Sequence, residues 1–491
     1  MREISCAMPR PRQVAIPAIT LRLQASGPLS APALAAALRV DDSNIRRALA
    51  LPEISPHLVR LGTRRGATYA LRRPIRNLGD TFPLRRIDTT GRAHDWAELT
   101  ALHGGWQLTW ADPAHPPAWA GEICALGGFC EGFPFFLSEL RPQGFLGRAV
   151  GRTLPPSLGL SPDPREWPND DDTLVYLAAE GDDLPGDLLV GDAMLRRAQD
   201  RLLNPPAALP DSERATRYPE LATAAASTGI AGPSVEGEQP KFLATLSSPP
   251  PPVGLNVSSS SDRSSAPPPY STPVIVKFTD VLSTPTGRRW ADLLAAEAHA
   301  LTLLHAHGEA HAAPRLLDAG NRRFLETPRY DRVGPHGRRG VVSLRALHDA
   351  FGGPDAHLWT AAAANLRARD LIDDATLRSI RLRHAFGRLI GNTDMHFGNL
   401  AFWFDDSLPF RLAPAYDQLP MLWAPAPGNA TPTPDFAPTL PLPAEREIWQ
   451  EAAAWADEFW QRVTADPRVS RPFAAIATAA LATVRHLRAV A

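Results

Sequence analysis

The chain has 491 residues, 44% of them apolar and 21% charged, which is enough for several packed domains and excludes a fibrous or wholly disordered protein. Its 51 basic and 52 acidic residues leave a net charge of −1, so the overall charge does not indicate binding to nucleic acid or to an anionic membrane. The charge is uneven, however. Up to Asn77 there are thirteen arginines and four acidic residues, a net charge of +9, which leaves −10 for the remainder. The sequence therefore predicts a basic N-terminal part joined to an acidic body.

The three cysteines, an odd number, do not indicate a disulfide framework and favour a reducing compartment. Cys124 and Cys130 have no second Cys/His pair nearby, so we expect two packed or free thiols rather than a zinc site. The N-terminus lacks an apolar core of signal-peptide length, and no stretch reaches about 18 uninterrupted apolar residues. The alanine-rich end at 473–491 reads as an amphipathic surface helix. We therefore expect a soluble, cytoplasmic protein with no membrane partner.

Lysine is almost absent from the chain. Of the 51 basic residues only Lys241 and Lys277 are lysines, and the others are arginine. A compact ammonium and a planar guanidinium are not interchangeable at a specific site. The two lysines are therefore candidate functional residues, although both could also be ordinary solvated charges.

Residues 1–77 have the pattern of a winged helix-turn-helix. Residues 18–24 form an apolar element that ends at Gly27. Two short helices are then expected, from Ser30 to Leu38 and over 43–51 with Asp42 or Ser43 as the cap of the second, followed by strands over 57–62 and 67–72. The turn between the two strands carries arginines.

This N-terminal part is a candidate DNA-binding domain. Asn44, Arg46 and Arg47 would face the major groove, and Arg64 and Arg65 would meet phosphates or the minor groove. The alternative is a small interaction domain with an ordinary solvated basic face.

Residues 78–208 are expected to form a mixed α/β subdomain, and they contain no catalytic spacing. Residues 133–148 are apolar enough to pack against another domain.

Residues 209–491 predict a bilobal, kinase-like domain. Strands over 240–246 and 273–279 flank a Pro/Ser-rich segment, about 247–272, that cannot bury enough apolar surface to order itself. We therefore expect a mobile insertion within a hairpin. Helices follow over 290–307, 355–370, 374–390, 445–465 and 472–490. The expected fold class is thus multidomain α+β, with a small strand-rich lobe and a larger helical lobe.

The parts needed for phosphoryl transfer occur in protein-kinase order. A glycine-containing loop at 232–241 leads into a strand, and the β-branched run 274–277 ends in Lys277. Glu297, in the next helix, could pair with that lysine. Each of these features alone could be a turn, a strand-edge lysine or a solvated charge.

Two acidic motifs follow the lysine and the glutamate. Asp394 and Asn399 are separated by four residues, as in the kinase D-x-x-x-x-N loop. Asp417 follows a strand-like segment and offers oxygen ligands for Mg²⁺. Either aspartate could instead end a helix or occupy a turn, but all five parts in this order favour a kinase-like active site.

The sequence resembles the HipA family of serine/threonine kinases, which are toxins of toxin–antitoxin systems. The resemblance rests on SVEGEQPKF, VIVKFTD, PRYDR at 328–332, GNTDMHFGN and PAYDQLP, and it covers about three-quarters of the chain. The N-terminal winged helix is similar to that of the longer, YjjJ-type members. The resemblance implies an ATP- and Mg²⁺-dependent kinase that phosphorylates a protein serine or threonine, in the best-known members on an aminoacyl-tRNA synthetase of the translation machinery.

The resemblance also implies roles for individual residues. Lys277 would bind the α and β phosphates, and Asp394 would orient or deprotonate the acceptor hydroxyl, with His396 matching the family's D-x-H motif. Ser234 would be an autophosphorylated serine in the phosphate loop. The expected magnesium ligands are Asn399 and Asp417, and the expected nucleotide-binding residues are Ser234, Val235, Gly237, Gln239, Lys241, Lys277, Glu297, Tyr330, Asn399 and Asp417.

Two departures from the family pattern leave the acceptor open. The lysine after D-x-H is replaced by Phe397-Gly398, and Pro328 stands where a glutamate often precedes R-[FY]-D-R. A small-molecule phosphotransferase, and a DNA-binding regulator whose kinase half has lost turnover, remain alternatives. The sequence also leaves open whether a separate antitoxin exists.

Overall fold

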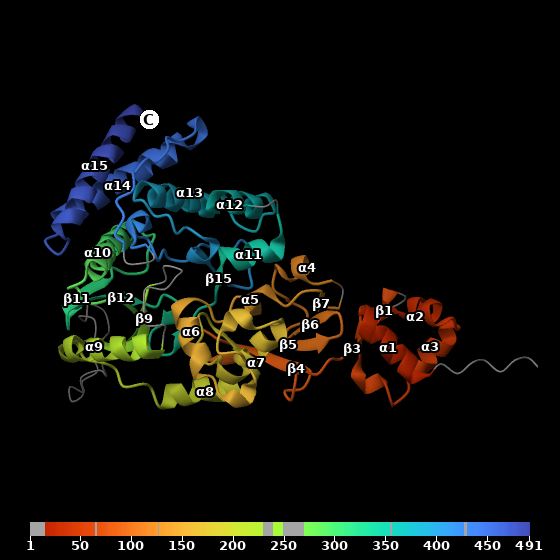
Figure 1. Ribbon diagram of the computed structural model, residues 1–491. Coiled ribbons are helices and arrows are strands. Elements are labelled where there is room, and N and C mark those ends of the chain that lie inside the picture. The colour runs from red at the N-terminus through yellow and green to blue at the C-terminus, as the bar shows by residue number, and fades with distance from the viewer. Residues whose placement is uncertain are drawn as a thin grey trace, which may run out of the picture.

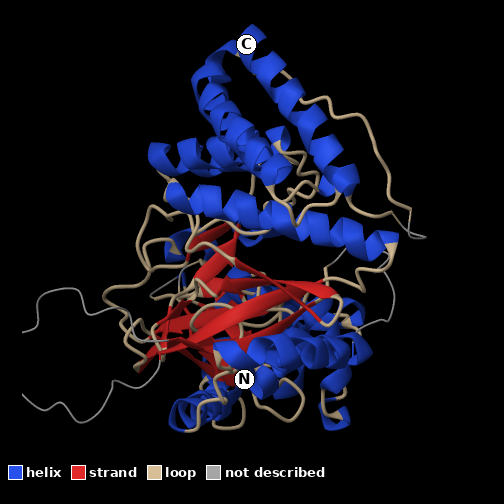
Figure 2. Cartoon of the chain, turned by 90° about the vertical axis from the view of Figure 1, so that its left-hand side faces the viewer, coloured by secondary structure: helices blue, strands red, loops and turns tan. Residues whose placement is uncertain are grey.

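The computed structural model describes residues 15–63, 66–125, 127–228, 239–248, 270–353, 356–426 and 430–491. The chain forms several parts, most of them built around a sheet. In Figure 1 a small N-terminal part lies at one end, followed by a central part and a strand-rich part. A layer of helices lies above the strands (Figure 2). The expected multidomain α+β architecture is confirmed.

The N-terminal part contains three helices and a small antiparallel sheet. Its Ser30 hydroxyl accepts a hydrogen bond from the Ala33 amide at 3.3 Å, as expected for an N-cap. The third helix begins earlier than expected, because Asp41 is its N-cap and Asp42 lies in its first turn. The elements are α1 (Ile16–Ser26), β1 (Leu29–Ser30), α2 (Ala31–Leu38), α3 (Asp42–Leu49), β2 (Leu58–Leu61) and β3 (Thr68–Leu71), with the strands in the order β1-β3-β2.

Apolar and ionic contacts attach the N-terminal part to the central part. Phe129 packs against a cluster made of Val59, Leu61, Ala70 and Leu102. Arg73 binds the Asp171 carboxylate, with Nη2 3.0 Å from Oδ1. The two parts are therefore joined by specific contacts as well as by the chain.

The central part is built on one antiparallel sheet with helices around it. Its strands are β4 (Thr81–Ile87), β5 (Ala93–Leu102), β6 (Gly105–Trp110), β7 (Phe129–Cys130) and β8 (Leu188–Val190), in the order β7-β6-β5-β4-β8. Its helices are α4 (Ala120–Ile123), α5 (Phe135–Ser138), α6 (Gly144–Thr153), α7 (Asp170–Glu180) and α8 (Gly191–Leu203).

The two cysteines of the central part are bonded to each other. The sequence predicts packed or free thiols at Cys124 and Cys130, and this prediction is wrong, because the two form a disulfide. The reason is a tight turn: the Ala125 amide donates to the Phe129 carbonyl at 2.7 Å and brings the flanking cysteines together. Sequence spacing alone does not reveal such a turn.

The central part shares a core with the C-terminal helical part. Phe136 stacks on Phe404 with ring centroids 5.4 Å apart. Phe135 contacts Phe351 edge-on, also at 5.4 Å. The expectation that residues 133–148 pack against another part of the chain is confirmed.

The strand-rich part is a four-stranded antiparallel sheet with one helix on each side in Figure 1. Its elements are α9 (Asp211–Thr228), β9 (Lys241–Ser248), β10 (Tyr270–Phe278), α10 (Pro285–Ala306), β11 (Arg315–Ala319) and β12 (Arg322–Pro328), with the strands in the order β11-β12-β10-β9. Strands β9 and β10 form the expected hairpin, with Ser248 opposite Tyr270. Residues 249–269 of the expected mobile insertion lie outside the described residues.

The C-terminal part is mainly helical. It contains β13 (Arg332–Val333), β14 (Gly337–Arg338), β15 (Val341–Ser343), α11 (Leu344–Phe351), α12 (Trp359–Ala368), α13 (Asp374–Leu389), β16 (Ala401–Trp403), α14 (Arg446–Ala465) and α15 (Arg471–Val490). The last three long helices, α13 to α15, agree with the expected bounds within one residue. Helix α10 begins earlier than expected and α12 later, because Thr284 and Leu358 are their N-caps.

Helix α15 is expected from the sequence to be amphipathic. One face, formed by Phe473, Ala477, Ala480 and Val484, is buried in a core shared with α14. Of the helices in the described ranges, α15 alone is long and apolar enough, judged by length and composition only, to cross a membrane.

Candidate active site

The two lysines of the chain lie directly opposite each other. Lys241 on β9 pairs with Lys277 on β10 in antiparallel register, and residues paired in this way project from the same face of a sheet. Two like charges are unfavourable at such positions unless anions lie close by. The pair therefore marks the face of the sheet that is suited to negative charge.

Lys277 is buried between two carboxylates. Its Nζ lies 2.6 Å from Oε1 of Glu297 on α10 and also binds Oδ1 of Asp417, and only 7% of Lys277 is exposed. Burial acts to lower the pKa of Lys277, but the charges of Asp417 and Glu297 outweigh it and raise the pKa above its ordinary value. Lys277 is therefore a fixed positive charge at this site.

Asp417 stays ionised although it is surrounded by protein. Burial acts to raise the pKa of Asp417, but Lys277 and Lys241 prevail and lower it to about 2. Its backbone φ is +50°, which is uncommon for a residue other than glycine, and such conformations are concentrated at functional sites. The local fold thus holds a negative charge in a strained backbone position next to Lys277.

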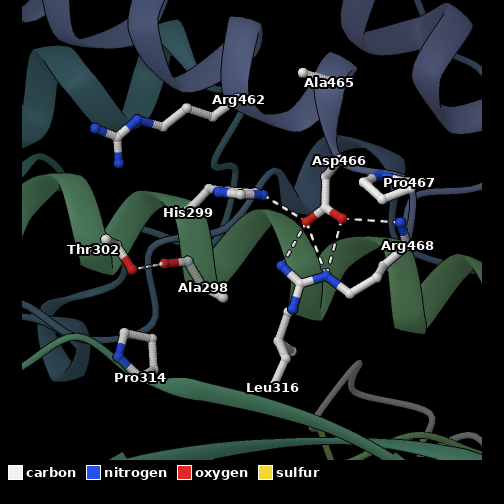
Figure 3. A pocket seen from close by; sticks show the side chains of 10 residues that line it. All are labelled: Ala298, His299, Thr302, Pro314, Leu316, Arg462, Ala465, Asp466, Pro467 and Arg468. Atoms are coloured by element: carbon white, nitrogen blue, oxygen red, sulfur yellow. Dashed lines mark hydrogen bonds and ion pairs between the residues drawn. The ribbon is translucent and has the colours of Figure 1, made fainter.

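Helix α10, which carries Glu297, is anchored to the C-terminal helices. His299 Nε2 lies 2.7 Å from Oδ2 of Asp466, at the edge of a surface pocket of about 700 Å³ (Figure 3). Asp292 accepts hydrogen bonds from the amide and the hydroxyl of Ser470, each at 2.7 Å. These contacts hold the helix on which Glu297 meets Lys277.

The segment between α13 and β16 brings the aspartate–asparagine pair to the same site. Asn392 Oδ1 accepts a hydrogen bond from the Asp394 amide at 3.0 Å, and Asn392 Nδ2 donates to the Asp417 carbonyl at 3.3 Å. Asn399 Nδ2 donates to the Asp394 carbonyl at 2.8 Å. Two asparagines thus fix the backbone of Asp394, while Asp394 itself is exposed.

Partial desolvation of Asp394 favours its use as a proton acceptor. Partial desolvation raises the pKa of Asp394, with the charge of His396 opposing the shift and that of Asp417 adding to it. A carboxylate with a raised pKa is better suited to accept a proton than an unperturbed one.

The shape of this segment is held by other polar contacts. His396 Nδ1 accepts a hydrogen bond from the Gly398 amide at 3.0 Å. The His396 carbonyl accepts one from the indole of Trp359 on α12 at 2.9 Å. The segment is therefore attached to a helix of the C-terminal part.

Several buried polar atoms near Lys277 have no hydrogen-bond partner among the described residues. They are Nε2 and Oε1 of Gln239, Oε2 of Glu297 and Oε1 of Gln418. Buried polar groups are paired in the large majority of cases, so a group of unpaired ones is expected where a polar ligand binds. Of these atoms only Nε2 of Gln239 can donate a hydrogen bond to a phosphate oxygen, and the positive charge for a polyphosphate comes from Lys241 and Lys277.

Among the residues that the structure describes, protein side chains alone do not supply a complete set of ligands for a metal ion at this site. Within the described ranges, no group of three or more His, Cys, Asp or Glu side chains is placed to hold a metal. The Asp417 carboxylate and the Asn399 amide offer oxygen ligands, which suit Mg²⁺ when substrate phosphates and water complete its shell.

Tyr330 packs against Tyr416, the residue before Asp417. Its ring stacks on Tyr416 with centroids 5.9 Å apart, and the Tyr416 hydroxyl donates to the Gly398 carbonyl at 2.6 Å. In the structure Tyr330 therefore supports the segments that carry Asp417 and Asp394, and a contact with nucleotide stays a prediction.

The neighbours of Tyr330 link the kinase-like part to the central part. Asp331 lies between Arg329 and Arg332, with N–O distances of 2.9 and 2.7 Å, and accepts a hydrogen bond from the Gly186 amide at 2.9 Å. Arg332 also binds Asp183 at 2.7 Å. Residues 328–332 thus join two parts of the fold, a role that the motif alone does not show.

The structure brings together most of the residues singled out from the sequence. Lys241, Lys277, Glu297 and Asp417 form one charged cluster, with Gln239 beside it, and Asn392 connects this cluster to Asp394. Asn392 and Tyr416 are site residues that the sequence analysis did not single out, although each lies within two residues of an expected aspartate. The predicted residues Ser234, Val235, Gly237, Arg64 and Arg65 lie outside the described residues.

A partly buried glutamate of the central part, Glu139, lies close to the two stacked tyrosines. Glu139 is the residue that ends α5, and it accepts a hydrogen bond from the Ser343 hydroxyl at 2.8 Å. Burial raises the pKa of Glu139 to about 7, although the Ser343 hydrogen bonds oppose the shift. Glu139 is therefore protonated in the folded protein under mildly acidic conditions.

This raised pKa predicts a dependence of stability on pH. The folded protein binds the Glu139 proton more tightly than the unfolded chain, so the contribution of this group to stability falls as pH rises from about 5 to about 8, by roughly 3 kcal/mol in total. Glu139→Gln removes the titration. We therefore expect the melting temperatures of variant and wild type to be similar at pH 5 and the variant to melt increasingly later as pH rises. A constant difference across this range would contradict the assignment.

Comparison with known proteins identifies the class. A family model described as "HipA-like C-terminal domain" matches residues 233–484, and one described as "YjjJ-like toxin, middle domain" matches residues 78–199. The first match places the C-terminal half of the chain among the HipA-like kinases, a phosphotransferase family that uses ATP. The protein Toxin YjjJ of Escherichia coli (strain K12) is 34% identical over 458 residues, which are 92% of this chain and 94% of that protein. The chain belongs to the YjjJ-like toxins, and the resemblance seen in the sequence is confirmed.

Two solved structures are more distant. HipA of the Shewanella oneidensis MR-1 toxin–antitoxin system, solved with HipB and its operator DNA, is 14% identical, covers 83% of this chain and 96% of its own, and has a TM-score of 0.49. The Helicobacter pylori proinflammatory kinase CtkA is 12% identical, covers 44% of this chain and 87% of its own, and has a TM-score of 0.30.

Proposed function

We propose that this protein is an ATP- and Mg²⁺-dependent serine/threonine protein kinase of the HipA toxin type. The observation that carries the proposal is the Lys277 ammonium, which is bound to both Glu297 and Asp417. Asn392 ties the backbone of Asp394 to that of Asp417. Phosphoryl transfer depends mainly on positioning and on charge stabilisation, and these groups supply both.

Each residue has a defined part in the proposed reaction. Lys277 binds the α and β phosphates, and Asp417 and Asn399 hold Mg²⁺. The metal supplies charge neutralisation of the phosphates when it is bound. Asp394 accepts the proton of the acceptor hydroxyl, whose oxygen forms a bond to the γ-phosphorus as the bond to the leaving ADP oxygen breaks.

A protein is a better candidate than a small molecule for the acceptor of the phosphoryl group. Asp394 and His396 are exposed, so a side chain on a large acceptor could reach Asp394 without entering a deep pocket. A small metabolite would need a closed site to exclude water.

Labelling with ATPγS tests the proposed activity. Full-length wild-type protein in a cell lysate is expected to thiophosphorylate discrete protein bands, and Asp394→Asn is expected to label none. Labelling of a small molecule only would favour a metabolite kinase. Absence of both labelling and ATP hydrolysis would favour a regulator whose kinase half has lost turnover.

We also propose that Ser234 is a self-inhibitory phosphorylation site. A phosphate adds about −1.5 to −2 charges at neutral pH. We expect it to be repelled by Glu236 and Glu238, which follow Ser234 closely in the sequence, and by the ATP phosphates. After incubation with Mg·ATP, intact-mass spectrometry should find one phosphate on wild type and none on Ser234→Ala or Asp394→Asn. The phosphorylated form should bind ATP more weakly. Phosphate confined to the serines of 247–272, or an unchanged ATP affinity, would contradict this role.

For the N-terminal part we propose a winged helix that binds DNA or takes the place of a separate DNA-binding antitoxin. Support comes from the element order α1, β1, α2, α3, β2, β3 and from Arg46 and Arg47, which are exposed on α3. Both are partnered on their own helix, Arg46 by Asp42 at 2.8 Å and Arg47 by Asn44 at 2.8 Å. A short recognition helix with exposed arginines is typical of DNA-binding modules of this kind.

The salt dependence of DNA binding tests this proposal. If three to five arginines meet phosphates, the slope of log K against log salt for the full-length protein should be about −3 to −4.5. Arg64→Ala with Arg65→Ala should flatten it by up to about 2 without relaxing sequence preference. Arg411→Ala, an exposed arginine of the C-terminal part, should leave the slope unchanged. No binding at roughly 50 mM salt, where phosphate contacts are still strong, would leave the interaction-domain alternative.

A further inference from the structure

A second pocket lies on the C-terminal part, away from the cluster around Lys277. It has a volume of about 270 Å³ and lies between α13 and the residues that precede α14. Leu358, Leu440 and Leu442 are among the residues that line it. We call this pocket the α13 groove.

Exposed apolar side chains gather at the α13 groove. In the described residues ten large apolar side chains are markedly exposed, and three of them line this one pocket: Leu358 at 49%, Leu440 at 50% and Leu442 at 67%. Single exposed leucines are ordinary, whereas a group of them beside a concave surface marks an interaction site.

The charged side chains of the α13 groove are mostly cationic. The Arg381 guanidinium forms no ion pair or hydrogen bond with any residue that the structure describes, and the Arg388 guanidinium donates only to the Thr439 hydroxyl, at 3.1 Å. Glu445 is the single acidic residue in the lining. The groove therefore presents unsatisfied positive charge next to its leucines.

A buried histidine adds a polar group to the α13 groove. His384 is 91% buried, since only 9% of it is exposed, and it lines the groove. Its ring nitrogens have no hydrogen-bond partner in the part of the chain that the structure describes. Burial lowers the pKa of His384 to about 4, with a smaller contribution from Arg388. The neutral ring can both donate and accept a hydrogen bond.

The α13 groove is connected to the proposed catalytic segment. Helix α13, which carries three of its polar residues, leads directly into Asn392 and Asp394. Leu358 precedes Trp359, whose indole holds the His396 carbonyl. A protein bound in the groove would therefore lie on the part of the fold that presents Asp394.

We propose that the α13 groove is a docking site for the protein that this kinase phosphorylates, and that it binds a segment carrying apolar and acidic side chains. Leucines of the groove would cover the apolar side chains, and Arg381 and Arg388 would pair with the carboxylates. A nucleic acid supplies the negative charge but no aliphatic side chains for the leucines. The inference rests on the proposed kinase function.

Binding of designed peptides to the full-length protein tests the groove directly. The probes are a fluorescein-labelled peptide of leucine and glutamate and a matched peptide of leucine and lysine, compared by fluorescence anisotropy. Wild type should prefer the glutamate peptide. Leu440→Asp with Leu442→Asp should weaken binding about tenfold or more, as expected when central contacts are removed. Arg381→Glu with Arg388→Glu should reverse the preference towards the lysine peptide.

A control and a kinetic measurement complete the test. Leu203→Asp is the matched control, because Leu203 is 81% exposed at the end of α8, outside the groove. With a serine appended to the glutamate peptide, the two leucine changes should raise KM about tenfold or more and leave kcat unchanged. Equal binding of the two peptides, or binding that the groove variants do not alter, would overturn the proposal. Selective binding without any phosphoryl transfer would instead refute the proposed kinase function.

Discussion

Lys277→Arg is expected to lower turnover by about 10²-fold or more, although it conserves the positive charge, because positioning and electrostatics supply nearly all the catalysis in phosphoryl transfer. The ammonium is a compact donor that can reach between two phosphate oxygens, whereas the guanidinium is larger and planar. The effect should appear in kcat for thiophosphorylation or for ATP hydrolysis.

Two carboxylates in contact with the Lys277 ammonium constrain a larger group at this position. The side chain is buried, its Nζ is 2.6 Å from Glu297, and it also contacts Asp417. A guanidinium at this place would push one of the two carboxylates away. Because Asp417 is itself a proposed magnesium ligand, the displacement would disturb metal binding as well as the phosphates.

A second substitution of Lys277 distinguishes the effect of the shape of the side chain from the effect of its positive charge. Lys277→Met removes the charge and has a similar length, so it should be inactive and leave Glu297 and Asp417 without their shared cation. If Lys277→Arg retained turnover near that of wild type while Lys277→Met did not, charge alone would suffice and the proposed fit of the ammonium would be wrong. Near wild-type turnover in both variants would remove Lys277 from the active site.

Much of the kinase-like part could be predicted from the sequence, because its signals are local. The β-branched run before Lys277 is typical of a buried strand, and helical periodicity marked α13, α14 and α15 within one residue. Lysine scarcity was also informative, since the only two lysines turned out to be directly paired across β9 and β10.

Contacts between distant segments could not be predicted in the same way. The disulfide between Cys124 and Cys130 depends on a turn whose geometry has no periodic pattern. The packing of Phe136 on Phe404 joins residues far apart in the chain, and apolar composition predicts that such a segment is buried but does not identify its partner. Asn392 was missed because a lone asparagine near a helix end usually indicates only a turn.

Asp394→Asn is expected to abolish phosphoryl transfer while leaving nucleotide binding largely intact. The change removes the group that accepts the proton of the acceptor hydroxyl, and general-base catalysis of this kind contributes about 10²- to 10⁴-fold. The local structure should survive, because Asn392 and Asn399 hold Asp394 through its backbone amide and carbonyl rather than through its carboxylate.

Asp417→Asn should fail at an earlier step, the binding of Mg²⁺ and nucleotide. It replaces a fully ionised carboxylate, whose pKa is lowered to about 2, with a neutral amide, and a hard cation is held less well without that charge. It also removes one of the two carboxylates that bind Lys277. Calorimetry with a nonhydrolysable ATP analogue, with and without Mg²⁺, distinguishes the two variants. Asp405→Asn, at a carboxylate that pairs with Arg411 outside the site, serves as the control. The metal-dependent part of the nucleotide affinity should be lost in Asp417→Asn and retained in Asp394→Asn. An equal loss in both variants would contradict the assignment of Asp417 to magnesium binding and of Asp394 to proton transfer.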